Sequence, residues 1–188
     1  MLIGASLDAA ILQLPSRQQR NTFFRAVRLA FASDPLGKGR PIVGGRFNIA
    51  GGARVLYLAD DQITALHEAQ AFGFPASSIA IVPIECNLHA VVDLRDPVVQ
   101  ALLHTNDLEL STNFRSLPPG SPPSPTQLLG EKVSASRGIE GLIYDSSARP
   151  GHTNLALIEA ALKVLGSFAA VNDPNRFRER LESMVHLI

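Results

Sequence analysis

Short apolar runs alternate with polar residues along the chain, and extended and helical patterns follow one another without a strict order. The extended patterns predict β-strands at residues 23–29, 55–59, 78–86, 90–94, 141–144, 154–162 and 165–171, although 154–162 also fits a helix. Strands and helices that mix in this way favour an α+β fold, with mixed β-sheets flanked by short helices, over a doubly wound parallel sheet.

Apolar residues with a helical period occupy much of the remaining chain. They predict helices at residues 6–14, between Asp61 and Gly73, and at 97–103, 126–136 and 174–187. We expect Ser6 to cap the first helix and Asp60 or Asp61 to cap the second. The first and last helices are interpreted as additions to the main body of the domain. The proline-rich residues 117–125 predict an extended surface loop.

Length and composition are typical of one globular domain, residues 1–188. The chain is 46% apolar and 18% charged, and its formal net charge is zero, which argues against nucleic acid as the main partner. Its one cysteine, Cys86, is expected to be buried and suits a reducing compartment. The pattern contains neither a signal peptide nor a membrane span, so we expect a cytoplasmic protein without membrane contact.

Candidate chemistry begins in a glycine-rich stretch, residues 44–52. Arg46 lies in this stretch, Tyr57 in the strand after it and Glu68 in the following helix, eleven residues apart each time. A second polar cluster, residues 145–149, follows another apolar strand. A cation, a phenol and a carboxylate near a glycine-rich loop indicate a site for an anionic nucleotide.

Several common types of active site do not fit the sequence. His67 and Glu68 begin like a zinc-protease helix, but the second histidine is missing, and we expect no metal. Neither Ser146 nor Ser147 lies in the Gly-x-Ser-x-Gly motif of a hydrolase. The glycines of residues 44–52 match neither the phosphate loop nor the dinucleotide fingerprint.

A site assembled from distant segments remains. Arg46 can bind a diphosphate in a bidentate manner, and Tyr57 can stack on a planar ring. Glu68, at the border of its helix face, can stabilise positive charge that develops on a ribose. From spacing alone, each residue also has a structural alternative: a loop arginine, a core tyrosine or a solvated helix glutamate.

The polar and glycine-rich blocks resemble the RES domain, a family named after an arginine, a glutamate and a serine. The resemblance rests on residues 44–48, 56–59, 65–68, 141–149 and 154–157, which occur in the family's order and span about 23–158. It implies a fold related to ADP-ribosyltransferases and a bacterial toxin with a helix-turn-helix antitoxin. It also implies NAD+ as substrate, cleaved at the nicotinamide–ribose bond by hydrolysis or phosphorolysis.

Family roles can be assigned to particular residues by motif. Arg46 matches the family arginine, Glu68 the family glutamate and Tyr57 a ring-stacking tyrosine. Because the family serine directly precedes an Ala-Arg pair, Ser147 is preferred to Ser146, and both are expected at the nucleotide. Together these matches imply that Arg46 orients the diphosphate while Glu68 stabilises the oxocarbenium-like ribose.

Further nucleotide contacts are implied by the same resemblance. Arg25 occupies the position of another family arginine near the nucleotide, and Phe47 and Asn48 follow the loop arginine. Family members often carry tryptophan and proline where this chain has Phe47 and Ile49. Phe47 is expected to keep an aromatic wall beside the nucleotide, whereas Ile49 changes the loop sequence next to Arg46.

The resulting hypothesis is a toxin that degrades NAD+ as a glycohydrolase or phosphorylase. One alternative is a protein ADP-ribosyltransferase that uses the same site and modifies a protein target. Another is a nucleotide-binding module without catalytic activity. Nucleic acid is expected only as a partner of the antitoxin.

Overall fold

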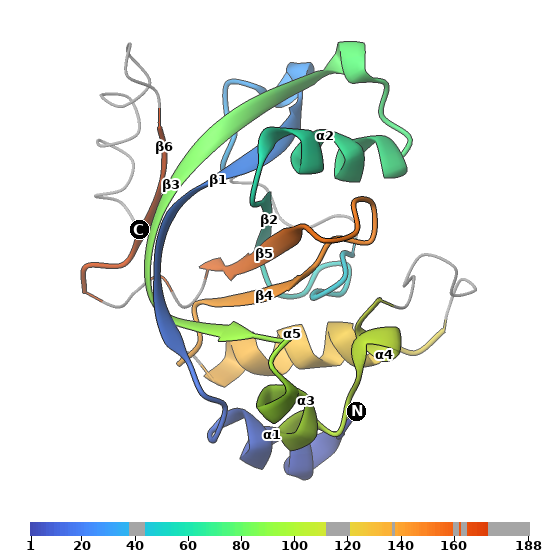
Figure 1. Ribbon diagram of the computed structural model, residues 1–188, viewed down its shortest axis with the longest axis vertical. Coiled ribbons are helices and arrows are strands. Elements are labelled where there is room, and N and C mark those ends of the chain that lie inside the picture. Colours follow the sequence, from blue (N-terminus) through green and yellow to red (C-terminus); the bar gives the residue numbers. More distant parts are fainter. Residues whose placement is uncertain (38–43, 112–120, 137, 160–161, 163–164, 173–188) are drawn as a thin grey trace.

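The structure is a computed structural model of the chain, and it describes residues 1–37, 44–111, 121–136, 138–159, 162 and 165–172. Its dominant feature is a long antiparallel ribbon formed by β1 (Arg17–Arg28) and β3 (Ile79–Asp93), which curves around the other elements (Figure 1). The two strands are paired over almost their whole length, so the ribbon acts as a continuous frame for the site on its concave side.

The remaining strands complete one six-stranded sheet with the order β1-β2-β5-β4-β3-β6. They are β2 (Val55–Ala59), β4 (Gly141–Asp145), β5 (Thr153–Ile158) and β6 (Phe168–Val171). All neighbouring strands are antiparallel except β3 and β4, which are parallel. Because β1 also pairs with β3, the pairings of five strands close into a ring.

The helices lie at two places around this sheet (Figure 1). Helix α2 (Gln62–Ala71) crosses the concave side of the ribbon, against β1, β2 and β3. The other α-helices of the described residues gather at the opposite end: α1 (Gly4–Ile11), α3 (Pro97–Leu103), α4 (Asp107–Ser111) and α5 (Pro125–Ser136). None of the helices in the described ranges is both long and apolar enough to cross a membrane.

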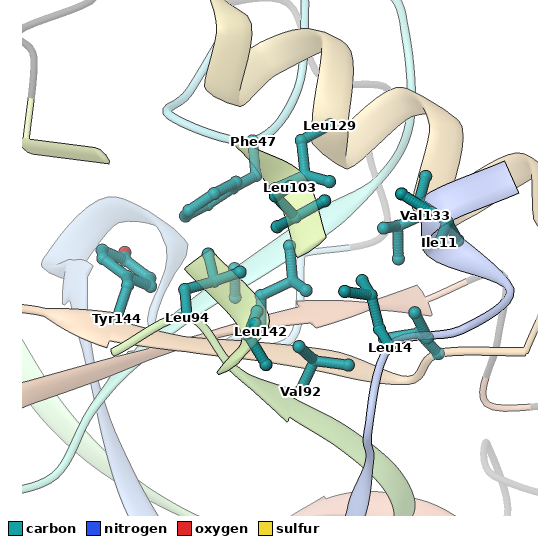
Figure 2. Packing of buried hydrophobic residues seen from close by; sticks show 14 of the residues in the cluster. Ile11, Leu14, Phe47, Val92, Leu94, Leu103, Leu129, Val133, Leu142 and Tyr144 are labelled. Atoms are coloured by element: carbon teal, nitrogen blue, oxygen red, sulfur yellow. The ribbon is translucent and has the colours of Figure 1, made fainter. Parts of the chain in front are cut away.

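The central strands are buried on both faces, which explains their continuous apolar sequence. On one face, Leu142 and Tyr144 of β4 pack with α1, α3 and α5 in a core that also contains Phe47 (Figure 2). On the other face, Ile143 and Leu155 pack inside the curved ribbon. The sheet is therefore a rigid support for the loops that leave its edges.

The α+β fold predicted from the pattern is confirmed, and several elements have the expected bounds. Residues 55–59 form β2 and residues 97–103 form α3. The Asp61 side chain caps α2 by accepting hydrogen bonds from the backbone N–H groups of Ile63 and Thr64. Cys86 is fully buried in β3, as expected.

Two predicted strands, 78–86 and 90–94, are one strand in the structure, so this prediction was wrong. The predicted gap between them, residues 87–89, contains the polar residues Asn87 and His89. In the structure Asn87 pairs with Arg20 of β1, and Leu88 between the two polar residues is fully buried. Pairing with the long β1 strand therefore keeps this segment extended.

The first helix also differs from its prediction. It begins at Gly4 after Ile3, which provides no side-chain cap, so Ser6 lies inside the helix. The helix is not an appendage, because Leu7 and Ile11 belong to the main core. The predicted helix at 174–187 and residues 117–120 of the predicted loop lie outside the described residues. Residues 121–124 belong to no helix or strand, as predicted, and Pro125 begins α5.

Candidate active site

A cavity of about 510 Å³ opens on the concave side of the ribbon, between α2, β1 and β2. A volume of this size lies within the usual range for small-molecule sites. Five of the residues singled out from the sequence line it, although they come from five separate segments: Arg25, Arg46, Tyr57, Glu68 and Ser147. The structure thus brings these side chains to one cleft.

Arg46 is fixed at the wall of this cavity by contacts on both sides of its guanidinium. One terminal nitrogen donates to the Leu110 carbonyl of α4, and the other donates to Ser147 Oγ at 3.1 Å. The guanidinium carbon lies 5.5 Å from the centre of the Tyr144 ring, within range of a cation–π interaction. The cation is therefore held in place before any ligand binds.

Tyr57 holds the glycine-rich loop in position through its hydroxyl. This oxygen accepts from the Phe47 N–H at 2.9 Å and donates to Asn48 Oδ1 at 2.7 Å. A Cβ atom on Gly45 would lie 2.4 Å from the same hydroxyl, so only glycine fits there. Burial raises the pKa of Tyr57, which keeps its hydroxyl protonated and excludes it as a general base.

Helix α5 supports the loop from behind. Glu131 accepts hydrogen bonds from the N–H groups of Ile49 and Ala53, at 3.0 and 2.9 Å. Gly130 of the same helix approaches the loop so closely that a Cβ atom would lie 1.8 Å from the Phe47 carbonyl oxygen. This contact could not be predicted from the sequence, because Gly130 and Phe47 lie 83 positions apart in the chain.

The Glu68 carboxylate is oriented by two donors, one in the loop after β4 and one in β5. Its Oε1 accepts from Ser146 Oγ and from Asn154 Nδ2, each at 2.7 Å. Within the described part of the chain, Oε2 makes no hydrogen bond. One oxygen is thus fixed by the protein, and the other is left for a ligand.

The two neighbouring serines have different positions. Ser146 is 3% exposed, does not line the cavity, and also accepts the backbone N–H of Arg149 at 3.0 Å. Ser147 is exposed, lines the cavity and contacts Arg46. Geometry thus gives Ser146 a positioning contact with Glu68 and places Ser147 where a ligand can reach it.

A polar clamp joins the serine loop to the start of α2. Arg149 donates from one nitrogen to Asp61 Oδ2 at 2.6 Å and to Thr64 Oγ1 at 3.0 Å. Burial acts to raise the pKa of Asp61, but hydrogen bonds from Thr64 and Ile63 and the charge of Arg149 lower it to about 2. The clamp keeps Ser146 and the helix that carries Glu68 in a fixed relation.

Asp60, Asp61 and His152 also offer a group of potential metal ligands, with one atom from each lying within 4.8 Å of the others. This group could not be predicted from the sequence, because its histidine lies far along the chain from the two aspartates. However, Arg149 Nη1 lies 2.6 Å from the same Asp61 oxygen, and His152 Nδ1 lies 2.8 Å from it. The guanidinium already neutralises this carboxylate, so the group is interpreted as part of the clamp.

Arg25 lines the cavity, but its guanidinium is engaged by the protein. It donates to the Pro35 carbonyl in the segment after β1. Burial lowers the pKa of Arg25 to about 10, an effect that the nearby Asp34 partly offsets. Arg25 therefore remains a cation at neutral pH and contributes positive charge to the cavity wall.

Phe47 and Asn48 do not lie where they were expected, and both are corrected here. Phe47 is fully buried and packs edge-on against Tyr144, with ring centroids 4.9 Å apart (Figure 2). Asn48 is 3% exposed and bonds Tyr57, and neither residue lines the cavity. Gly130 allows α5 to pack closely against this part of the loop, so Phe47 and Asn48 lie in the core beneath the cavity and support the position of Arg46.

Two residues of the site were missed as functional candidates. Asn154 opens the motif 154–157 but was treated as part of a strand, and its contact with Glu68 depends on the pairing of β5 with β4. The pattern predicts Tyr144 only as a strand residue, whereas in the structure the Arg46 guanidinium lies over its ring. The polar character of Asn154, at the start of an otherwise apolar strand, could have indicated a functional role.

Fold and cavity together define an α+β protein with a cleft that joins a guanidinium, a carboxylate and a hydroxyl. The family model of the RES domain matches residues 22–178, and the chain belongs to this family. The match extends beyond the expected region, 23–158, toward the C-terminus.

A solved structure has the same fold. It is the crystal structure of the M. tuberculosis MbcT–MbcA toxin–antitoxin complex, with a TM-score of 0.64 and 19% sequence identity. The similarity covers 90% of this chain and 91% of that one. No curated protein matches the chain.

Proposed function

We propose that this chain cleaves NAD+ at the bond between nicotinamide and ribose, and that it is the toxin of a toxin–antitoxin pair. The observation that carries the proposal is the shared cavity of Arg46, Tyr57, Glu68 and Ser147. Membership of the RES domain family supports NAD+ as the substrate. We also propose that the fold is related to that of ADP-ribosyltransferases and that the protein acts in the cytoplasm.

The chemistry needs a negative charge beside the sugar. When the N-glycosidic bond breaks, its electron pair moves to the pyridinium nitrogen, so nicotinamide leaves as a neutral molecule and the ribose becomes oxocarbenium-like. The Glu68 carboxylate stabilises this cation, as carboxylates do in glycoside hydrolysis. Its orientation by Ser146 and Asn154 means that no rearrangement is needed during the reaction.

The diphosphate of the dinucleotide is negatively charged, so its binding requires a positive charge in the site. Arg46 presents its remaining N–H donors to the diphosphate, and Ser147 adds a hydroxyl next to it. The ring of Tyr57 forms part of the cavity wall and stacks on nicotinamide. Its protonated hydroxyl holds the loop and takes no proton from the acceptor.

The acceptor completes the reaction. With water, the products are ADP-ribose, nicotinamide and one proton; with inorganic phosphate, they are ADP-ribose 1-phosphate and nicotinamide. The solved relative is named as a toxin–antitoxin complex, and this supports an antitoxin, with a helix-turn-helix domain, as the partner of this chain.

Incubation of the purified protein with NAD+ labelled in the adenine half tests the proposal, with and without phosphate. Release of nicotinamide together with ADP-ribose or its 1-phosphate is expected. Label on a macromolecule would instead identify a protein ADP-ribosyltransferase. Binding of NAD+ in calorimetry without nicotinamide release would identify a binding module and contradict the proposal.

A further inference from the structure

The cavity has a second end with different chemistry. Beyond Glu68, its wall is formed by an aromatic arm, defined here as Phe24, Arg28, Phe72, Phe74 and Ile79. The arm lies at the C-terminal end of α2 and the adjoining parts of β1 and β3. None of these residues is used by the bond cleavage proposed above.

Two backbone features fix the arm. Strand alternation places Phe24, Ala26 and Arg28 on one face of β1, opposite the buried Phe23 and Val27. After α2, Gly73 has φ +83, and the N–H of Phe74 reaches back to the Ala69 carbonyl at 3.3 Å. The position of Phe74 is therefore set by the helix end and not by a free loop.

Arg28 stacks on this aromatic surface. Its guanidinium carbon lies 5.6 Å from the Phe74 ring centre and 5.6 Å from the Phe31 ring centre. Phe74 lines the cavity, whereas Phe31 does not. The pair Phe74 and Arg28 thus offers a flat apolar surface beside fixed N–H donors.

This combination fits one class of ligand. Phe72 and Phe74 are 49% and 36% exposed and line the same cavity, and exposed apolar side chains that gather in this way are typical of a ligand-binding groove. The small side chains of Ala26 and Ala69 also line this cavity. A planar heterocycle can stack on the rings while its ring nitrogens accept from Arg28.

We propose that the aromatic arm binds the adenine base of the substrate while the Glu68 end holds the nicotinamide riboside. The inference rests on the proposed function for the identity of the dinucleotide. The cavity is continuous between its two ends, and the Arg46 guanidinium in its wall is suited to the diphosphate that joins the two halves. Purine recognition by the arm itself can be measured without any turnover.

Calorimetry with AMP and with ribose 5-phosphate, which lacks the base, tests the arm. The wild-type protein is expected to bind AMP more tightly than ribose 5-phosphate by on the order of tenfold, the usual effect of one base–aromatic stack. Phe74→Ala should remove most of this difference. Phe31→Ala is the matched control, because it loses the same contact with Arg28 outside the cavity and should leave AMP binding unchanged.

A third variant separates stacking from simple apolar contact. Phe74→Leu keeps an apolar side chain without a flat ring, so it should weaken AMP binding as Phe74→Ala does. Equal binding of AMP and ribose 5-phosphate by the wild-type protein, or full AMP binding by Phe74→Leu, would overturn the inference. Nicotinamide release is measured in parallel: cleavage of NAD+ without a base effect refutes only the arm, and a base effect without cleavage refutes only the proposed reaction.

Discussion

Asn154 Nδ2 donates a hydrogen bond to Glu68 Oε1 at 2.7 Å across 86 residues of sequence. Ser146 donates to the same oxygen at the same distance. The strand that carries Asn154 and the loop that carries Ser146 are neighbours because β4 and β5 pair directly. The carboxylate therefore depends on the sheet for its orientation and on α2 only for its attachment.

Glu68→Gln should keep the fold and lower kcat for nicotinamide release by on the order of 10²-fold or more, because the charge beside the developing cation is lost. The amide oxygen of glutamine can still accept from Ser146 and Asn154, so the loss is not structural. Thermal unfolding of the variant checks this control. Near-normal turnover of NAD+ would contradict the role of Glu68.

Replacement of Ser146 and of Ser147 should affect different steady-state parameters. Ser146→Ala removes one hydrogen bond that orients Glu68, and we expect kcat to fall on the order of tenfold with little change in KM, as for loss of a bond to a charged group. Ser147→Ala changes a group that lines the cavity, so KM should rise instead. A rise in KM for Ser146→Ala with unchanged kcat would reverse the assignment.

Most residues of this site could be predicted from the sequence, but the contacts between them could not. Arg46, Tyr57 and Glu68 were found because a guanidinium, a phenol and a carboxylate stand out near glycines. The strand positions followed from period and composition, and β2 and α3 have the predicted bounds. These features depend on residues that are close together in the chain, and such local patterns can be recognised in a single sequence.

Contacts across the sheet could not be predicted in this way. The burial of Phe47 depends on Gly130 of α5, and the role of Ser146 depends on Glu68 of α2. The residues next to Phe47 and Ser146 in the sequence do not indicate these partners. Likewise, the continuity of β3 through Asn87 could not be predicted, because the pairing that keeps this residue extended comes from β1.

Tyr57→Phe should destabilise the loop that carries Arg46. The hydroxyl links the Phe47 N–H to Asn48 Oδ1, and without it these buried groups lose their partner. We expect the free energy of unfolding to fall by ~1–3 kcal/mol and KM for NAD+ to rise. Chemical denaturation and initial rates measure the two effects.

The second tyrosine provides the matched control for this variant. Tyr144 also lines the cavity, but its hydroxyl makes no hydrogen bond to any residue in the described ranges. Tyr144→Phe should therefore have a clearly smaller effect on stability. Equal losses in the two variants would show that the contact of Tyr57 with the loop is unimportant.

Gly130→Ala should be more damaging than most glycine replacements in a helix. An added Cβ atom would lie 1.8 Å from the Phe47 carbonyl oxygen, so α5 must move away from the loop. Alanine is otherwise the better helix former by ~1 kcal/mol, which would predict stabilisation. Loss of thermal stability in this variant, with no loss in Gly138→Ala, where the nearest atom lies 4.0 Å away, would identify the contact as the cause.

Asp61→Asn tests the clamp between α2 and the serine loop through the pH dependence of stability. Asparagine still caps the helix, but it cannot carry the charge that pairs with Arg149. Because the folded pKa of Asp61 is about 2, below the ordinary 3.8, the charged form stabilises the fold above 3.8. This contribution decreases as the pH falls from 3.8 toward 2, where the folded carboxylate takes up its proton.

The expected result is therefore a difference in unfolding free energy that depends on pH. Wild-type protein should be more stable than Asp61→Asn at neutral pH, and the two should converge as the pH approaches 2. Urea unfolding followed by circular dichroism at a series of pH values measures the difference directly. A gap that stays constant over this acidic range would mean that Asp61 stabilises the helix through its cap alone, and that its ion pair with Arg149 adds nothing.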